Sequence, residues 1–441
     1  MTPSARLDAA IGLLAMIEAE PERSADRLIA AFFRARRYAG AKDRRAVSDF
    51  VWTILRRRGE LAWRLETLKT GAEARSLALA ALILTEGMAA AAVAALCTGG
   101  RFAPPPLSPA ETALLDGLAR LAVAALPAVA ALPAVAALPA WAAGNYPAWL
   151  DASLSARFGA DLLPEMAAFG TRAPADLRVN SLKATREAVL AALAQAGIAA
   201  DPTPLSPLGL RLDRQQPLNT TAAFRQGWIE PQDEASQLVA LLADARPGMD
   251  VVDLCAGAGG KALAMAAAMK NQGRILACDA DPRRLVRLKP RAARAGASVI
   301  ELCDLAAGVP AAAGVADRVL LDVPCSGSGA WRRRPETRWR LTPADLARDL
   351  AVQAALLTQG ARLVRPGGRL IYATCSLLPE ENEAPVERFL AATPGFRRLQ
   401  PASVWSEVLG GFCPIDGPYL LFTPRRHGVD CVFAAFLGRV A

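Results

Sequence analysis

The sequence predicts an α/β protein whose C-terminal half forms a mainly parallel β-sheet covered by helices on both faces. Three observations support this expectation. Apolar strand-like segments alternate with helical segments from residue 227 onward, which is the pattern of a parallel sheet with crossover helices. Residues 1–122 carry one amphipathic helical pattern after another, and residues 145–226 mix short strand and helix patterns. We therefore expect an all-α domain, a small α+β domain and a larger α/β domain, in that order.

The composition of the chain excludes some classes of protein and favours others. Its 441 residues suffice for two or three domains, and 53% apolar with 21% charged residues excludes wholesale disorder. The single histidine, His427, excludes a zinc helix that needs two, and no Cys-x-x-Cys pair occurs, so we expect no metal. A formal charge of +9 favours a polyanionic partner such as nucleic acid.

Residues 123–144 are rich in alanine and proline and are expected to link the first two domains. A Val-Ala-Ala-Leu-Pro-Ala repeat fills most of this segment. The uncharged run resembles a membrane span, but Pro127, Pro133 and Pro139 argue against one continuous spanning helix. The N-terminus lacks the basic and apolar regions of a secretory leader. We therefore expect a cytoplasmic, monomeric protein with reduced thiols and no membrane contact.

The N-terminal helical patterns cover residues 5–18, 24–37 and 44–68. Basic residues cluster on their polar faces: Arg34, Arg36, Arg37, Lys42, Arg44, Arg45, Arg56, Arg57 and Arg58. Any one of these clusters is most simply a solvated helix face. Several clusters in one small domain favour an RNA-docking surface, although a solvated face stays an equal alternative.

Strand patterns in the chain follow a regular order. In the small domain, strands at 177–179 and 208–212 flank a helix at 184–196. The larger domain has predicted strands at 250–254, 274–278, 299–303, 318–323 and 369–373, and predicted helices at 260–269, 282–295 and 343–363. Two final strands, 419–422 and 431–437, could form an antiparallel hairpin at the sheet edge. Ligands of such sheets bind outside the carboxyl ends of the strands.

The loop after the first of these strands, residues 253–261, reads Asp-Leu-Cys-Ala-Gly-Ala-Gly-Gly-Lys. Its glycines let the backbone approach a ligand closely where a helix begins. Gly257, Gly259 and Ala262 match the dinucleotide pattern only loosely, and a phosphate-binding P-loop is excluded because Ala262 replaces the required Ser or Thr.

Acidic residues end the next two strands. Asp279 is placed to accept hydrogen bonds from ribose hydroxyls, and Asp304 is placed to contact an adenine amino group. Either residue alone could be a helix cap. Together with the glycine loop they predict a nucleoside pocket, which would suit both nicotinamide and S-adenosylmethionine.

Two cysteines lie at the ends of the fourth and fifth strands, Cys325 after Asp322 and Cys375 after Thr374. A thiolate that adds to carbon 6 of cytosine makes carbon 5 nucleophilic enough to attack a sulfonium methyl. Asp322 could hydrogen-bond the exocyclic amine of the base, and Lys261 could favour the thiolate. Cys325 is a candidate base for the carbon 5 proton, since no histidine is near.

The segments 253–261, 322–329 and 373–383 resemble those of the RsmB/Nop-type RNA cytosine-5 methyltransferases. Weaker matches at 177–180, 227–237 and 333–339 extend the resemblance over nearly the whole chain. It implies a NusB-like RNA-binding domain at 1–122, a small RRM-like domain at 145–226 and a Rossmann-like class I methyltransferase domain at 227–441.

The resemblance also implies roles for single residues. Cys375 would be the nucleophile and Cys325 would assist release of the methylated base. The residues that would line the S-adenosyl-L-methionine site are Cys255, Ala256, Gly257, Ala258, Gly259, Gly260, Lys261, Asp279, Asp304 and Asp322. The substrate would be ribosomal RNA ahead of transfer RNA. The chain departs from the family pattern at Ala258, Ala262, Val323 and 430–433, positions that bear on cofactor affinity and C-terminal packing.

Two other functions stay open from the sequence. A nicotinamide-dependent oxidoreductase is allowed by the glycine loop but leaves the paired cysteines without a role. A non-catalytic RNA-binding or ribosome-assembly factor could retain the same fold. Residues 331–340 interleave arginine with tryptophan, a combination that favours contact with single-stranded RNA.

Overall fold

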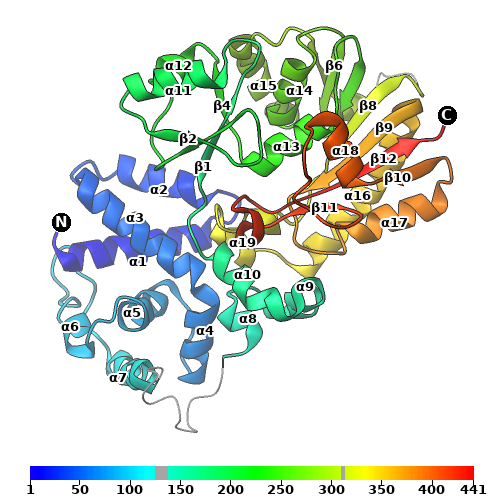
Figure 1. Ribbon diagram of the computed structural model, residues 1–441. Helices are drawn as coiled ribbons and strands as arrows, with labels where there is room; N and C mark the ends of the chain where they lie inside the picture. Colours follow the sequence, from blue (N-terminus) through cyan, green and yellow to red (C-terminus); the bar gives the residue numbers. More distant parts are fainter. Residues whose placement is uncertain (125–137, 309–312) are drawn as a thin grey trace. The chain divides into compact units, whose positions relative to one another are not determined.

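Met1–Thr171 and Trp331–Leu341 form a helical unit, and Arg172–Ala330 and Thr342–Ala441 form a sheet-containing unit. The computed structural model describes residues 1–124, 138–308 and 313–441 (Figure 1). Most of the Ala/Pro-rich repeat expected as a linker lies outside these described residues. The division into four parts at 122, 144 and 226 stays a prediction.

The helical unit confirms the expected all-α organisation. Apolar residues at helical spacing, including Leu13, Leu28, Val51 and Leu77, are fully buried in one core. Between residues 1 and 124 and beyond residue 137, no helix that the structure describes is both long and apolar enough to cross a membrane. The α-helices are α1 (Pro3–Ala19), α2 (Ala25–Arg34), α3 (Ala41–Arg56), α4 (Arg58–Thr67), α5 (Ala74–Leu84), α6 (Ala90–Ala94), α7 (Pro109–Ala124), α8 (Ala140–Ala143), α9 (Asp151–Phe158) and α10 (Leu162–Phe169).

A small antiparallel sheet opens the second unit. Its strands are β1 (Ala175–Val179), β2 (Ala200–Pro202), β3 (Gly209–Leu212) and β4 (Ile229–Pro231), in the order β2-β3-β1-β4. Helix α11 (Arg186–Gln195) buries Val189 and Leu193 in the same cluster as Leu177 and Leu210. A short helix, α12 (Ala222–Arg225), precedes β4. The structure thus confirms a small α+β fold in this segment.

The large sheet has the order β10-β12-β9-β8-β5-β6-β7, and β11 pairs with β12. Neighbours among β5 to β9 are parallel, whereas β12 is antiparallel to β9, β10 and β11. The expected antiparallel pairing of the two C-terminal strands is confirmed, but their expected place at the sheet edge is wrong, because β12 lies between β9 and β10. The edge strand β10 was not predicted. The strands are β5 (Asp250–Asp253), β6 (Arg274–Asp279), β7 (Ile300–Asp304), β8 (Ala316–Asp322), β9 (Val364–Thr374), β10 (Phe396–Leu399), β11 (Leu420–Phe422) and β12 (Val432–Arg439).

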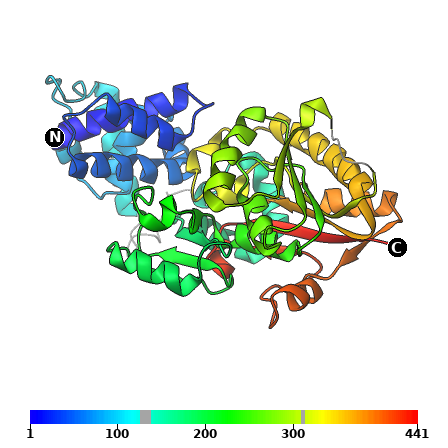
Figure 2. The same cartoon turned by 90° about the horizontal axis from the view of Figure 1, so that it is seen from above.

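Helices cover both faces of this sheet, as the views from two directions show (Figure 2). Adjacent strand residues such as Val251 and Val252 belong to different apolar clusters because their side chains point to opposite faces. One cluster includes α13 (Glu234–Leu242), α14 (Gly260–Ala268), α15 (Pro282–Ala295) and α18 (Pro401–Val408), and the other includes α16 (Pro343–Leu363) and α17 (Glu383–Ala392). A last short helix, α19 (Pro424–His427), follows β11.

The strand order places a switch point between β5 and β8. From β5 the chain continues outward to β6 and β7, and it then returns to β8 and β9 on the other side. The carboxyl ends of β5 and β8 therefore lie side by side, which is the usual ligand site of such sheets.

Candidate active site

The loop between β5 and α14 requires glycine at two positions. Gly257 and Gly259 have φ angles of 57° and 84°, in the left-handed region that other residues rarely adopt. A Cβ added to Gly259 would lie 2.0 Å from Cδ1 of Leu288 in α15. This loop is therefore held close against a neighbouring helix, and its glycines are structural requirements.

Two buried or half-buried arginines hold the carbonyl groups of the glycine loop. Arg178 of β1 donates a hydrogen bond to the Gly260 oxygen at 2.7 Å, and Arg291 of α15 donates to the Ala258 oxygen. Burial lowers the pKa of Arg178 to about 10. Sequence reasoning missed both roles, although Arg178 belongs to a segment used for the family resemblance.

Asp279 ends β6 beside the glycine loop. Its carboxylate is only 3% exposed and accepts hydrogen bonds from the backbone nitrogens of Gly257 at 2.8 Å and Asp281 at 2.9 Å. Arg284 forms an ion pair with it at 3.1 Å. Because a carboxylate has about four acceptor positions, Asp279 can organise the loop and still accept from a ligand hydroxyl.

Asp304 ends the neighbouring strand, where it pairs in register with Asp279. Its side chain is partly exposed and accepts a hydrogen bond from the Ala306 nitrogen at 2.9 Å. Asp304 thus caps the short helix that follows β7, and it lies on the same sheet edge as Asp279. The two expected nucleoside contacts are therefore neighbours in space.

Lys261 and Asp322 join the ends of β5 and β8. Their side chains form an ion pair at 2.6 Å, with Lys261 12% and Asp322 37% exposed. Burial acts to lower the pKa of Lys261, but the charge and hydrogen bond of Asp322 outweigh it and leave that pKa raised. The lysine is therefore a permanent positive charge beside the thiols.

Asp253, at the end of β5, carries an unsatisfied buried acceptor. The residue is 1% exposed, and among the described residues its Oδ1 has no hydrogen-bond partner. Burial, followed by the charge of Asp322, raises its pKa to about 7. A buried carboxylate normally has its acceptors filled. S-adenosylmethionine carries an ammonium group, hydroxyls and a sulfonium, so the residues present fit this cofactor.

The two cysteines expected to act together lie in contact. Cys325 follows β8 and Cys375 follows β9, and their Sγ atoms are 3.5 Å apart. Cys375 is exposed and Cys325 is half-buried, whereas Cys97, Cys278 and Cys413 are buried. Cys255 of the glycine loop is half-buried, and burial raises the pKa of its thiol, so it stays protonated.

The hydrogen bond between the two sulfurs shifts the pKa values of the two thiols in opposite directions. The hydrogen bond with Cys325 lowers the pKa of the Cys375 thiol, and the charge of Lys261 acts in the same direction, whereas the charge of Asp322 acts in the opposite direction. The same hydrogen bond and burial raise the pKa of Cys325 well above its ordinary value. Cys375 is thus the more acidic thiol of the pair and Cys325 the less acidic one.

A buried carboxylate connects the loops that carry the two thiols. Glu381 is fully buried and accepts hydrogen bonds from the hydroxyls of Ser326 and Ser376, from the Ser326 nitrogen at 2.8 Å and from Gln353 at 3.1 Å. Next to it, Asn382 donates to the Ser376 carbonyl at 3.0 Å. The sequence resemblance included this Pro-Glu-Glu-Asn-Glu run without assigning it a role.

Residues 331–340, expected to contact RNA, belong to the helical unit, and several of their side chains are buried. Trp331, Arg332 and Arg338 are 0%, 4% and 0% exposed. Arg338 donates hydrogen bonds to the carbonyl groups of Asn145 at 3.0 Å and Phe169 at 2.8 Å. The prediction of RNA contact is therefore wrong for these three side chains, because their aromatic and cationic groups are used to hold the helices together.

Comparisons with known proteins agree with the sheet and the loop geometry. The family model described as 16S rRNA methyltransferase RsmB/F matches residues 240–438, and the RsmF/B-like ferredoxin-like domain matches residues 146–219. A methyltransferase homolog protein from Pyrococcus horikoshii, of known structure, is 25% identical with a TM-score of 0.58, over 68% of this chain and 98% of its own. NSun6 from the same organism has a TM-score of 0.59 at 20% identity, over 67% and 98%, which supports the fold.

Curated relatives are similar over the same region. The probable ribosomal RNA small subunit methyltransferase B of Synechocystis is 36% identical over 66% of this chain and 66% of its own. The ribosomal RNA small subunit methyltransferase B of Vibrio cholerae is 32% identical over 65% and 67%. The match therefore spans slightly less than two thirds of the Synechocystis protein.

Fold and glycine loop together define a Rossmann-like methyltransferase domain, in agreement with these matches. The chain belongs to the RsmB/F family of 16S rRNA methyltransferases. This membership confirms the resemblance seen in the sequence and the expected cofactor, S-adenosylmethionine. It also removes the nicotinamide-dependent alternative.

Proposed function

We propose that the protein methylates carbon 5 of a cytosine in RNA, with ribosomal RNA as substrate ahead of transfer RNA. The printed names of its relatives support ribosomal RNA. The observation that carries the chemistry is the 3.5 Å contact between an exposed Cys375 and a half-buried Cys325. In this proposal the protein acts as a monomer in the cytoplasm.

The cofactor site is built on the glycine loop. Residues Cys255–Lys261 would surround S-adenosylmethionine, with Asp279 toward the ribose and Asp304 toward the adenine. Asp253 is added to this set because its buried Oδ1 needs a donor. When bound, the cofactor supplies a methyl group activated by its positive sulfur.

Cys375 would act first. Its thiolate forms a bond from Sγ to carbon 6 of the cytosine, and the electron pair of the carbon 5–carbon 6 double bond moves so that carbon 5 becomes nucleophilic. Asp322 would accept a hydrogen bond from the exocyclic amine and so orient the ring. A flipped or unpaired cytosine is required, since a stacked base cannot reach the thiol.

Cys325 would complete the reaction. After carbon 5 has gained the methyl group, it still carries one hydrogen. Removal of that proton restores the double bond as the carbon 6–sulfur bond breaks and Cys375 leaves as a thiolate. Cys325 lies within contact of Cys375 and is partly open to solvent. Its own proton would pass to water, and the resulting thiolate would take the carbon 5 proton and so return to the thiol form.

Two cysteine variants test the proposal. Methyl transfer from tritium-labelled S-adenosylmethionine is measured on ribosomal and transfer RNA from cells lacking the gene, and bisulfite sequencing locates the product. Cys375→Ala should abolish transfer, Cys325→Ala should accumulate a covalent protein–RNA adduct that survives denaturation, and Cys413→Ala should keep activity. Transfer that persists in Cys375→Ala would refute the mechanism. RNA binding by the wild type without any methyl transfer would instead indicate a non-catalytic RNA-binding factor.

A further inference from the structure

Two exposed aromatic rings lie in contact on the helical unit. Tyr38, in the loop between α2 and α3, is 66% exposed, and Phe102, in the loop between α6 and α7, is 57% exposed. Their ring centroids are 6.4 Å apart with planes inclined by 40°. Single exposed apolar side chains are normal, whereas large apolar side chains that adjoin one another at a surface mark a candidate site for a partner.

Arginines flank this aromatic pair. Arg101 holds its guanidinium 5.2 Å from the centre of the Phe102 ring, and Arg37 precedes Tyr38 as an exposed residue. Among the residues that the structure describes, no carboxylate lies within ion-pair distance of Arg37 or Arg101. Both cations are therefore available to a negatively charged partner.

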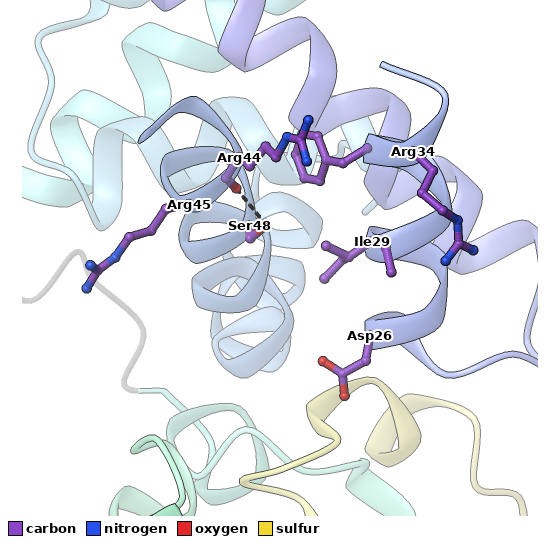
Figure 3. A pocket seen from close by; sticks show the side chains of 8 residues that line it. Asp26, Ile29, Arg34, Arg44, Arg45 and Ser48 are labelled. Atoms are coloured by element: carbon purple, nitrogen blue, oxygen red, sulfur yellow. Dashed lines mark hydrogen bonds between the residues drawn. The ribbon is translucent and has the colours of Figure 1, made fainter. Parts of the chain in front are cut away.

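The loop that carries Tyr38 also joins the two helices of a charged groove. Arg34 of α2 and Arg44 and Arg45 of α3 line this groove, together with Asp26 and Ser48 (Figure 3). Arg44 donates a hydrogen bond to the Ala39 carbonyl at 2.7 Å, which ties this loop to the start of α3. Asp26, at the beginning of α2, would repel a phosphate, so a phosphate would favour the part of the groove near Arg34 and Arg44.

Ion pairing distinguishes this surface from the other basic cluster of the helical unit. Arg57 pairs with Glu60 at 2.7 Å and Arg58 pairs with Glu18 at 2.6 Å. Those arginines already have carboxylate partners. Arg34 has none among the described residues, and Arg45 has only a 3.5 Å contact with Asp49 that leaves it 80% exposed. The sequence could not separate the two clusters, whereas the structure does.

We propose that Tyr38 and Phe102 form a stacking platform for unpaired bases of the RNA, and that Arg34, Arg37, Arg44 and Arg101 bind the adjoining phosphates. Every base offers an aromatic face, so such a platform tolerates many sequences but needs an unstacked strand. Charge complementarity favours RNA over an apolar protein partner, since Arg101 lies against the Phe102 ring and Arg37 directly precedes Tyr38. This inference rests on the proposed function in that RNA is the substrate.

Binding of a fluorescein-labelled single-stranded RNA to the full-length protein tests the platform. The same RNA annealed to its complement serves as the duplex probe. A Tyr38→Ala/Phe102→Ala variant should bind the single strand about 5- to 100-fold more weakly, the range expected for losing one stacked base, and bind the duplex as the wild type does. Tyr38→Phe and Phe102→Tyr keep the rings and should keep the affinity. Phe412→Ala, which removes an 83% exposed ring elsewhere, is the matched control.

Salt dependence and crosslinking distinguish RNA bound at the platform from RNA bound elsewhere on the protein. Arg37→Gln should reduce the slope of log affinity against log salt by about 0.7, the value for one phosphate on a single strand. Ultraviolet crosslinking should join RNA to peptides containing Tyr38 or Phe102. Unchanged single-strand binding by the double alanine variant would overturn the inference, and so would a change in self-association in place of RNA binding. Because binding is measured without methyl transfer, a wild type that binds through these rings but transfers no methyl would refute only the proposed function.

Discussion

Ser326 and Ser376 donate hydrogen bonds to the same carboxylate oxygen, Oε2 of Glu381. Each serine directly follows one of the two paired cysteines in the chain. The buried carboxylate thus joins two Cys-Ser dipeptides that lie 50 residues apart in sequence. The 3.5 Å separation of the sulfurs follows from this connection together with the neighbouring positions of β8 and β9.

Replacing Glu381 should reduce the rate of methyl transfer, because this residue holds the two loops that position the thiols. Glu381→Gln keeps one acceptor oxygen but replaces the other with an amide that cannot accept from a hydroxyl. We expect kcat to fall about 100-fold, as for a displacement near 1 Å, with KM for RNA nearly unchanged. Steady-state kinetics measure both constants. The surface variant Glu407→Gln is the control, and an equal kcat for the two variants would contradict the positioning role.

The acidity of Cys375 should respond in opposite directions to two substitutions. Cys325→Ala removes the hydrogen bond that lowers the pKa of Cys375, so that pKa should rise and alkylation near pH 7 should slow. Asp322→Asn removes a negative charge that raises this pKa, so it should fall and alkylation should quicken. The rate of iodoacetamide modification of Cys375 against pH, followed by mass spectrometry, measures both. Shifts of the same sign in the two variants would disprove the assigned electrostatics.

Asp279 should matter for cofactor affinity far more than its neighbour Asp281. Hydrogen bonds to a charged group contribute about 1.5–3 kcal/mol, so Asp279→Asn should weaken binding of S-adenosylmethionine about 10- to 100-fold. Asp281→Asn keeps the cap of α15 and should leave the affinity unchanged. Titration calorimetry gives the two dissociation constants. Similar values for both variants would remove Asp279 from the cofactor site.

Within residues 331–341, buried and exposed arginines should differ in their effect on stability. Arg338→Ala removes two hydrogen bonds to backbone carbonyls and leaves the Phe169 acceptor buried and the Asn145 acceptor half-buried, so the helical unit should lose about 2–4 kcal/mol of unfolding free energy. Arg334→Ala, at an exposed position, should change it by less than about 0.5 kcal/mol. Urea unfolding followed by circular dichroism compares them. Equal losses of unfolding free energy in the two variants would show that Arg338 stabilises the helical unit no more than an exposed arginine does.

The alternation of apolar strands and helices allowed most of the large sheet to be predicted. Residues such as Val251 and Leu320 lie in strands that are buried on both faces, and these produce a strong local pattern. Strand β10 was missed because its four residues include Arg397 and Arg398, which hide the apolar ends of the strand. The positions of Asp279 and Asp304 could be predicted because each residue ends such a strand.

Contacts between distant segments could not be predicted in the same way. Arg178 reaches the Gly260 carbonyl across 82 residues, and Glu381 reaches Ser326 across 55. Neither residue differs from a surface charge in local spacing or composition. Trp331 and Arg338 looked like an RNA contact for the same reason, because the motif of tryptophan and arginine does not report whether it is buried. Only the folded structure shows which of these side chains are buried and which residues they contact.

The placement of Trp331–Leu341 in the helical unit has a consequence for synthesis of the chain on the ribosome. Residues 1–171 emerge first, but Glu336, Arg338 and Arg340 complete their packing only after about 170 further residues have been made. At ~5–20 residues per second, this delay is roughly 10 to 30 seconds. During that interval the nascent helices lack the hydrogen bonds that Glu336, Arg338 and Arg340 later form with them, so the helical unit reaches its full stability only late in synthesis.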